Sequence, residues 1–123
     1  MYTYVLKNLN KYKLAYVHMV DGLAFGFHKL GDPFTLKEAR THYQGKLIGN
    51  CGYNQATAQA AVDAGDADLV AFGRPYLSNP DLVERFANNW PLNPDAPFSA
   101  FYGSAAVPDP RVGYTDFPFH TAA

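Results

Sequence analysis

The sequence predicts an α/β fold with parallel strands, because strand, glycine turn and helix follow one another twice in the same order. The first apolar run, residues 46–49, enters a turn that contains Gly52, and a helical segment follows. The second run, residues 68–72, ends at Gly73 and is also followed by a helical segment. Short apolar runs that alternate with helices are typical of parallel sheets. We therefore expect strands that lie adjacent in sequence order and are joined by right-handed crossovers.

The N-terminal part is expected to form a helix and then a strand. Apolar side chains recur at helical spacing within residues 2–11, and residues 14–20 form an apolar run. Residues 21–33 contain three glycines and the aromatic residues Phe25 and Phe27. We expect this segment to be a loop at the carboxyl end of the first strand, which is the side where barrel enzymes keep their chemistry.

Capping residues mark the next two helices. Thr35 and Glu38 have the spacing of a capping box, which predicts a helix N-terminus. Asn54 is an N-cap residue in front of residues 55–64, and Gly65 follows at the position where glycine ends helices. The sequence thus predicts one helix between the first two strands and another between the second and the third.

The third strand and the helix after it complete the β/α pattern. Residues 68–72 have the composition of a strand buried on both faces. Asn79 and Pro80 would supply the N-cap and the first-turn proline of a helix that carries Leu82 and Phe86. We assign the β/α units to residues 1–87 of a single domain.

Residues 88–123 are expected to be an irregular tail held by its aromatic side chains. The segment from Asn88 to Pro110 is rich in Pro, Asn, Asp and Ala. Aromatic side chains in such a tail usually anchor it to a neighbouring body. The aromatic residues are Trp90, Phe98, Phe101, Tyr102, Tyr114, Phe117 and Phe119.

Arg74 directly follows the glycine that ends the third strand. Backbone amides at glycine turns bind anions, and a guanidinium group adds a fixed fork of donors for phosphate oxygens. Each of these features, taken alone, also occurs in proteins where its role is purely structural. Two neighbouring turns with an arginine at the second are what the last strands of a phosphate-binding β/α barrel provide.

Composition and charge exclude several other functions. The chain has 123 residues, 48% of them hydrophobic, so it can form one domain with a sizeable core. A net charge of −1 without a basic cluster argues against binding to nucleic acid or to an anionic membrane. No apolar run has the length of a signal peptide core or a transmembrane span, so we expect a soluble, cytoplasmic protein.

Cysteine and histidine chemistry is not favoured. Cys51 is the only cysteine, which rules out an internal disulfide and a cysteine metal cluster and fits a reducing compartment. It has no histidine near it in sequence, so a small residue beside a ligand fits better than a nucleophile. The four histidines lack zinc-site spacing, and His18 is expected to be packed or hydrogen-bonded within a buried strand. The acidic residues Asp63, Asp66 and Asp68 read as helix-end and turn residues.

Five segments carry a family resemblance: AYVHMVDG, IGNCGY, GDADLVAFGRPYLSNPDLVERF, FYG and GYTDFP. In order and spacing they resemble the C-terminal portion of the old yellow enzymes, FMN-dependent ene-reductases that include N-ethylmaleimide reductase and the plant oxophytodienoate reductases. The resemblance covers nearly the whole chain. It implies a partial (β/α)8 TIM barrel, consisting of the last three β/α units and the aromatic-rich tail.

The resemblance also implies an FMN phosphate site. In the family, amides at the end of the seventh strand and a Gly-Arg pair after the eighth hold the phosphate, which here implies Asn50, Cys51, Gly73 and Arg74. The FYG tyrosine, here Tyr102, closes over flavin and substrate. Tyr53 and Phe72 lie beside these positions and are expected to be packing residues. The groups that hold the flavin ring and the substrate carbonyl come from earlier strands in the family, so no catalytic residue and no metal ligand is assigned.

Two hypotheses of function follow. In the first, the chain is the FMN-binding C-terminal segment of an NAD(P)H-dependent ene-reductase that reduces activated C=C bonds. It is then a truncated gene product or one part of a split enzyme, and alone it is inactive without the missing N-terminal barrel part. In the second, it is a non-catalytic module that self-associates and binds flavin or another phosphate. Both predict association, because an open parallel sheet leaves edges unpaired and apolar residues such as Leu69 uncovered.

Overall fold

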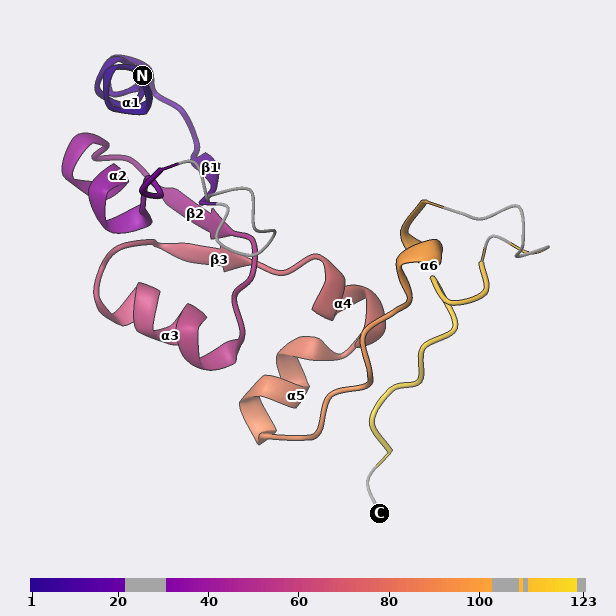
Figure 1. The fold of residues 1–123 in the computed structure, drawn as a ribbon. Coiled ribbons are helices and arrows are strands. Elements are labelled where there is room, and N and C mark those ends of the chain that lie inside the picture. The colour runs from indigo at the N-terminus through magenta and orange to yellow at the C-terminus, as the bar shows by residue number, and fades with distance from the viewer. Residues whose placement is uncertain (22–30, 103–108, 110, 122–123) are drawn as a thin grey trace. The chain divides into compact units, whose positions relative to one another are not determined.

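The structure, a computed structural model, describes residues 1–21, 31–102, 109 and 111–121. It divides the chain into two compact units, Met1–Ala71 and Phe72–Ala123. Phe25 and Phe27 of the predicted loop lie outside the described residues. The first unit contains α1 (Tyr2–Leu9), β1 (Val17–Val20), α2 (Leu36–His42), β2 (Leu47–Asn50), α3 (Gln55–Asp63) and β3 (Leu69–Ala71) (Figure 1).

The three strands form one parallel sheet in the order β1-β2-β3, which confirms the predicted order and direction. The strand β1 is shorter than predicted and starts at Val17 instead of Leu14. Its ladder begins where the Val17 amide donates to the carbonyl oxygen of Lys46 at 2.8 Å. The residues before Val17 precede the start of the neighbouring strand, so they have no ladder to join.

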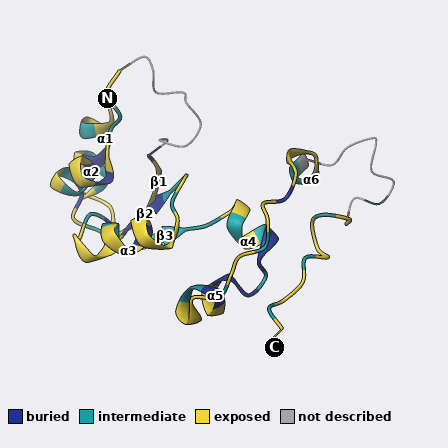
Figure 2. Ribbon diagram, turned by 60° about the horizontal axis from the view of Figure 1, so that its bottom comes forward, coloured by how far each residue is buried: buried dark blue, intermediate teal, exposed yellow. Residues whose placement is uncertain are grey.

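The core lies between the sheet and the helices, which Figure 2 shows along one side of the sheet. Leu6 of α1, Leu36 of α2 and Leu47 of β2 are buried there. Gly49 allows the close approach of α2, because a Cβ atom at this position would lie 2.5 Å from Cδ1 of Leu36. The sheet is thus packed by helices on one face.

The opposite face of the sheet is exposed in this unit. His18 of β1 pairs with Ile48 of β2, which pairs with Leu69 of β3, so these three side chains share that face. Leu69 exposes 59% of its surface and Val20 exposes 64%. The predictions that residues 68–72 are buried on both faces and that His18 is packed in a buried strand are therefore wrong. The described helices of this unit cover only the other face.

The helix N-termini predicted at Thr35 and Asn54 are confirmed. The Thr35 hydroxyl oxygen accepts a hydrogen bond from the Glu38 amide at 3.1 Å. The Asn54 side chain accepts from the Thr57 amide at 2.9 Å, and the Thr57 hydroxyl oxygen accepts from the Asn54 amide at 3.0 Å. This reciprocal capping box fixes the start of α3. Gly65 follows the end of α3 with a φ of 73°, a conformation that favours glycine.

Asp68 fastens the amino-terminal edge of the sheet. Its carboxylate accepts hydrogen bonds from Arg40 at 2.5 Å, from Lys46 at 2.8 Å and from the Leu47 amide at 2.9 Å. Lys46, the Leu47 amide and Arg40 together hold the pKa of Asp68 well below its usual range. Arg40 also donates to the carbonyl oxygen of Gly45 at 2.9 Å. Asp68 is therefore more than a turn residue, because it joins α2 to the starts of β2 and β3.

In the described part of the second unit there are three short helices, α4 (Arg74–Ser78), α5 (Leu82–Asn88) and α6 (Phe98–Tyr102). The prediction that Asn79 and Pro80 begin a helix is wrong, because the N-cap of α5 is Asp81. Asn79 instead ends α4, and its side-chain oxygen accepts from the Asn93 amide at 2.7 Å. A contact 14 residues further along the chain thus occupies the side chain that would have capped α5.

A buried ion pair helps to hold the C-terminal tail. Arg85 exposes 3% of its surface and donates to Asp81 at 2.6 Å and to the carbonyl oxygen of Pro118 at 3.0 Å. The other Asp81 oxygen accepts from the His120 amide at 2.6 Å. Burial raises the pKa of Asp81, but the His120 amide and Arg85 outweigh this effect and leave the pKa below its ordinary value.

The predicted aromatic residues of the tail differ in how far they are packed. Trp90 stacks on the His120 ring at a centroid distance of 4.1 Å. Phe98 and Phe119, however, expose 77% and 65% of their surfaces. The prediction of an irregular tail is wrong for residues 98–102, which form α6, and the ion pair of Arg85 and Asp81 is a tail contact that was not predicted.

Candidate functional site

The predicted residues Asn50 and Cys51 lie at the carboxyl end of β2. Asn50 is the last residue of the strand, where it pairs with Val20 on one side and Ala71 on the other. The Asn50 carbonyl oxygen accepts from the Asp21 amide at 3.4 Å, directly after β1. In open parallel sheets, ligands bind beyond the carboxyl ends of the strands. Asn50 and Cys51 therefore occupy the edge of the sheet where a ligand is expected.

Two successive residues in this turn have a left-handed backbone. Cys51 has a φ of 89° and Gly52 a φ of 85°. Positive φ is readily available to glycine but is uncommon for a residue with a side chain. Backbone strain of this kind persists only when the surroundings enforce it, and it is concentrated at functional sites. The strained residue is Cys51, which the family resemblance predicts at the phosphate site.

Tyr53 bonds across to the neighbouring strand. Its hydroxyl group donates a short hydrogen bond to Oδ2 of Asp21, which exposes 7% of its surface. Burial raises the pKa of Tyr53, and the Asp21 carboxylate raises it further, so the hydroxyl group remains a donor throughout the physiological pH range. Sequence reasoning treated Tyr53 as a packing residue and missed this pair. The available signal was that both residues follow the carboxyl ends of neighbouring strands.

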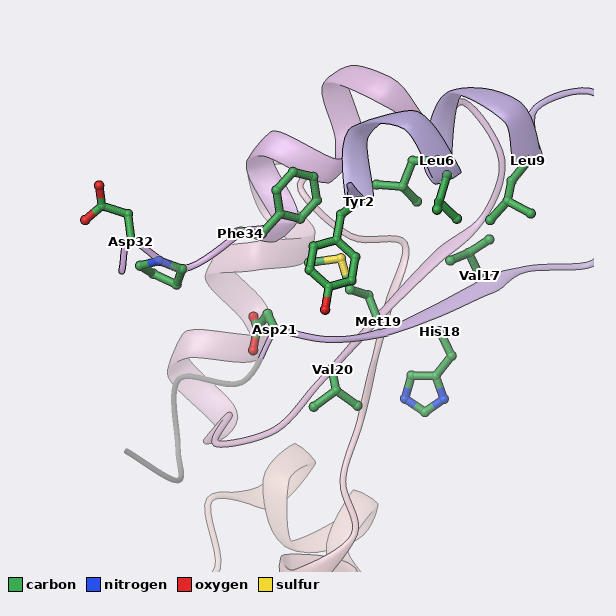
Figure 3. Close-up of a pocket in the computed structure, with 12 residues that line it drawn as sticks. Tyr2, Leu6, Leu9, Val17, His18, Met19, Val20, Asp21, Asp32 and Phe34 are labelled. Carbon is green, nitrogen blue, oxygen red and sulfur yellow. The ribbon is translucent and has the colours of Figure 1, made fainter. Parts of the chain in front are cut away.

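A cavity of about 500 Å³ lies between α1, β1 and residues 32–34. In Figure 3, Val17 and Met19 point toward α1, whereas His18 and Val20 point away from it. Leu6, Leu9 and Phe34 are among the apolar side chains of the lining. Asp21 also lines the cavity, and its Oδ1 atom has no hydrogen-bond partner among the residues that the structure describes.

The other predicted site residues belong to the second unit. Gly73 is the N-cap of α4, and Arg74 is its first residue, followed by Pro75. Tyr102 is the last residue of α6. The glycine of the FYG segment, Gly103, lies outside the described residues. The structure thus places Asn50 and Cys51 in one unit and Gly73, Arg74 and Tyr102 in the other.

Among the described residues, no group of three His, Cys, Asp or Glu side chains could hold a metal ion. In the same part of the chain, no helix is both long and apolar enough to cross a membrane.

Known proteins match this chain over most of its length. Residues 3–93 match the NADH:flavin oxidoreductase / NADH oxidase family. The chain is 41% identical to 12-oxophytodienoate reductase 7 of Oryza sativa over 116 residues, which cover 87% of this chain and 28% of the relative. It is 39% identical over 116 residues to 12-oxophytodienoate reductase 2 of Arabidopsis thaliana, and the match covers 94% of this chain and 30% of that relative.

The fold is similar to solved structures of old yellow enzymes. The old yellow enzyme from Trypanosoma cruzi superposes with a TM-score of 0.82 at 32% identity, over 98% of this chain and 29% of that one. Morphinone reductase superposes with a TM-score of 0.78 at 39% identity, over 98% of this chain and 30% of that one. The chain therefore spans less than a third of the length of these relatives. Enzymes of the matched family use FMN as their cofactor, with a nicotinamide nucleotide as electron donor. The family match spans more than half of the sequence, and this chain accordingly belongs to the NADH:flavin oxidoreductase / NADH oxidase family.

Proposed function

We propose that this chain supplies the phosphate half of the FMN site of an NAD(P)H-dependent ene-reductase. The observation that carries the proposal is the left-handed turn at Cys51 and Gly52, directly beyond β2. Residues that leave the strand conformation at such a turn free their amide groups from the sheet, and successive free amides form anion-binding concavities. The FMN phosphate is the anion that membership of this family supplies.

The second half of the proposed phosphate site is Gly73 and Arg74. Ala71 pairs with Asn50 in the sheet, and Gly73 comes two residues after Ala71 in the sequence. The Arg74 guanidinium group can bind two phosphate oxygens at once, which a backbone amide cannot do. In this proposal, Asn50, Cys51, Gly73 and Arg74 hold the phosphate, and Tyr102 covers the flavin.

The proposal gives this chain a binding role. Bound FMN would supply hydride transfer from a nicotinamide donor to an activated C=C bond. The residues of this chain would fix the phosphate end of the cofactor and thereby orient it. Because no residue here is assigned to the flavin ring or to a substrate carbonyl, we attribute the reductase activity to a complete enzyme. The parallel sheet and the matches to barrel enzymes support the finer proposal that the chain forms three β/α units of an eight-unit barrel.

Cys51 offers a direct test, because it is the only cysteine and lies in the proposed phosphate site. Alkylation of Cys51 by iodoacetamide should slow when FMN is added. Riboflavin, which lacks the phosphate, should protect Cys51 much less. Arg74→Ala should abolish the protection by FMN, whereas Arg111→Ala should preserve it, because Arg111 is exposed and pairs with Asp109. Equal protection by FMN and riboflavin would overturn the phosphate assignment.

We further propose that the exposed face of the sheet associates with the remaining part of such a barrel. Parallel sheets are normally covered on both faces, yet Val20 and Leu69 lie largely exposed on this one. The same observation favours the second candidate function, a flavin-binding module that self-associates through this face.

Sedimentation distinguishes association through this face from association elsewhere. The chain alone should self-associate, and Leu69→Lys should shift it toward the monomer by placing a charge on the apolar face. Val83→Lys is the matched control, because Val83 is similarly exposed, at 66%, but lies on α5. A monomeric parent chain, or equal effects of the two variants, would contradict a role for the exposed face.

A further inference from the structure

Asp21, which directly follows β1, makes a hydrogen bond on each side of the turn at Cys51 and Gly52. The Asp21 amide donates to the carbonyl oxygen of Asn50, which precedes the turn. The Asp21 side chain accepts from the hydroxyl group of Tyr53, which follows the turn. Asp21 thus bonds to the residues on both sides of the two left-handed positions.

The side-chain bond is hard to replace. Asp21 is buried, and its Oδ1 atom has no partner among the described residues, so the Tyr53 hydroxyl group is the side-chain donor that the structure shows for this carboxylate. A carboxylate removed from water requires such a donor, because an unbonded buried charge is strongly unfavourable. Asp21 and Tyr53 therefore hold each other's side chains in place. Because Tyr53 directly follows Gly52, this bond also fixes the point where the chain leaves the turn.

The residue after Tyr53 is anchored separately. Asn54 is held by its capping box with Thr57, so the first turn of α3 is capped by residues of the helix itself. The bond between Asp21 and Tyr53 holds the residue that directly follows Cys51 and Gly52. A non-glycine residue leaves the left-handed region readily unless its surroundings enforce it.

We propose that Asp21 and Tyr53 are positioning residues that hold the Cys51–Gly52 turn in its phosphate-binding conformation. The phosphate part of this inference rests on the proposed function, whereas the control of the turn does not. Neither residue is proposed to touch the phosphate. The hydrogen bond, and not the negative charge, carries the effect, since a carboxylate near a bound phosphate would repel it.

The first test needs no flavin. Tyr53→Phe removes the hydroxyl group and should raise the rate of Cys51 alkylation by iodoacetamide about tenfold, the factor that matches the loss of a typical hydrogen bond. Asp21→Asn keeps an oxygen acceptor for Tyr53 and should leave the rate near that of the parent chain. Tyr12→Phe is the matched control, because Tyr12 exposes 64% of its surface. An unchanged rate in Tyr53→Phe would overturn the proposal.

Amide hydrogen exchange separates a local effect from general destabilisation. In Tyr53→Phe, exchange should accelerate at the Asp21 amide, which donates to Asn50 beside the turn, while the Ala58 amide, which donates to Asn54 within α3, should keep its protection. Loss of protection at Ala58 as well would assign Tyr53 to overall stability and would overturn the positioning role.

The last test asks whether the conformation of the turn affects the binding of FMN. Tyr53→Phe should weaken FMN binding about tenfold and leave riboflavin binding unchanged. Asp21→Asn should bind FMN at least as tightly as the parent chain, and an equal loss in Asp21→Asn would overturn the assignment to the hydrogen bond. If Tyr53→Phe accelerates alkylation but every variant binds FMN and riboflavin with equal affinity, the control of the turn stands and the proposed FMN phosphate site fails.

Discussion

Replacing Asp68 by alanine should lower the unfolding free energy of the first unit by about 2 to 4 kcal/mol. The largest part comes from the Leu47 amide, which would lose its bond to a carboxylate at 2.9 Å. The Arg40 pair adds to this, because the two side chains expose only 26% and 25% of their surfaces. The Lys46 pair adds little, since the Lys46 side chain is 70% exposed and water screens it.

The same contacts predict how this stabilisation depends on pH. Lys46, the Leu47 amide and Arg40 lower the pKa of Asp68 in the folded chain below its ordinary value of 3.8. The folded chain therefore binds the proton more weakly than the unfolded chain does. The stabilisation is fully present above about pH 4 to 5 and is lost progressively as the pH falls below the unfolded value toward the folded one.

Urea denaturation followed by far-UV circular dichroism measures both effects. Asp68→Asn removes the titrating carboxylate. The difference in unfolding free energy between the parent chain and this variant should be clear at pH 7 and should shrink at pH 3. Asp63→Ala is the control, because Asp63 is exposed and its side chain bonds to Gln59 on the surface of α3. A loss below about 0.5 kcal/mol in Asp68→Ala, or a difference that persists unchanged at pH 3, would refute the reasoning.

Two further predictions concern the packing of each unit. Arg85→Ala should release the tail, because it removes the bond to Pro118 and leaves the buried Asp81 without its cation, and chymotrypsin should then cut faster near Phe117 than in the parent chain. An unchanged cleavage rate would contradict the anchoring role. Gly49→Ala should destabilise the first unit by about 1 to 3 kcal/mol in the same urea assay, because the new methyl group would collide with Leu36. A neutral effect would show that α2 can move away from the sheet.

Local sequence signals predicted the order of the sheet and the starts of two helices. Thr35 and Asn54 were identified as N-caps from their neighbours three residues ahead, and the cap bonds in the structure join those residues. Gly65 was likewise expected after α3, and its positive φ explains why glycine stands there. These features depend on interactions within one turn of helix, which a sequence displays directly.

Features that depend on distant residues could not be predicted. Asn79 resembled an N-cap, but its oxygen accepts from Asn93, so Asp81 begins α5 instead. The prediction of a strand buried on both faces failed at Leu69, because whether a face is covered depends on elements outside the strand. The bond between Asp21 and Tyr53 joins residues 32 positions apart, and neither residue type alone indicates it.

The predicted site residues differ in the observations that support them. Cys51 gained support from an observation that no sequence pattern contains, its strained backbone. Gly73 and Arg74 rest on chain order and on the chemistry of a guanidinium group. Tyr102 rests on the family resemblance, because the structure contributes only its place at the end of α6.

Paired titrations of FMN and riboflavin, followed by the quenching of flavin fluorescence, test the phosphate site most directly. The parent chain should bind FMN more tightly than riboflavin, because only FMN carries the phosphate. Arg74→Ala should weaken FMN binding by about 1 to 3 kcal/mol and leave riboflavin binding nearly unchanged, while Arg111→Ala should alter neither. Equal affinities of the parent chain for the two flavins, or an Arg74→Ala variant that binds FMN as tightly as the parent, would contradict the proposed function.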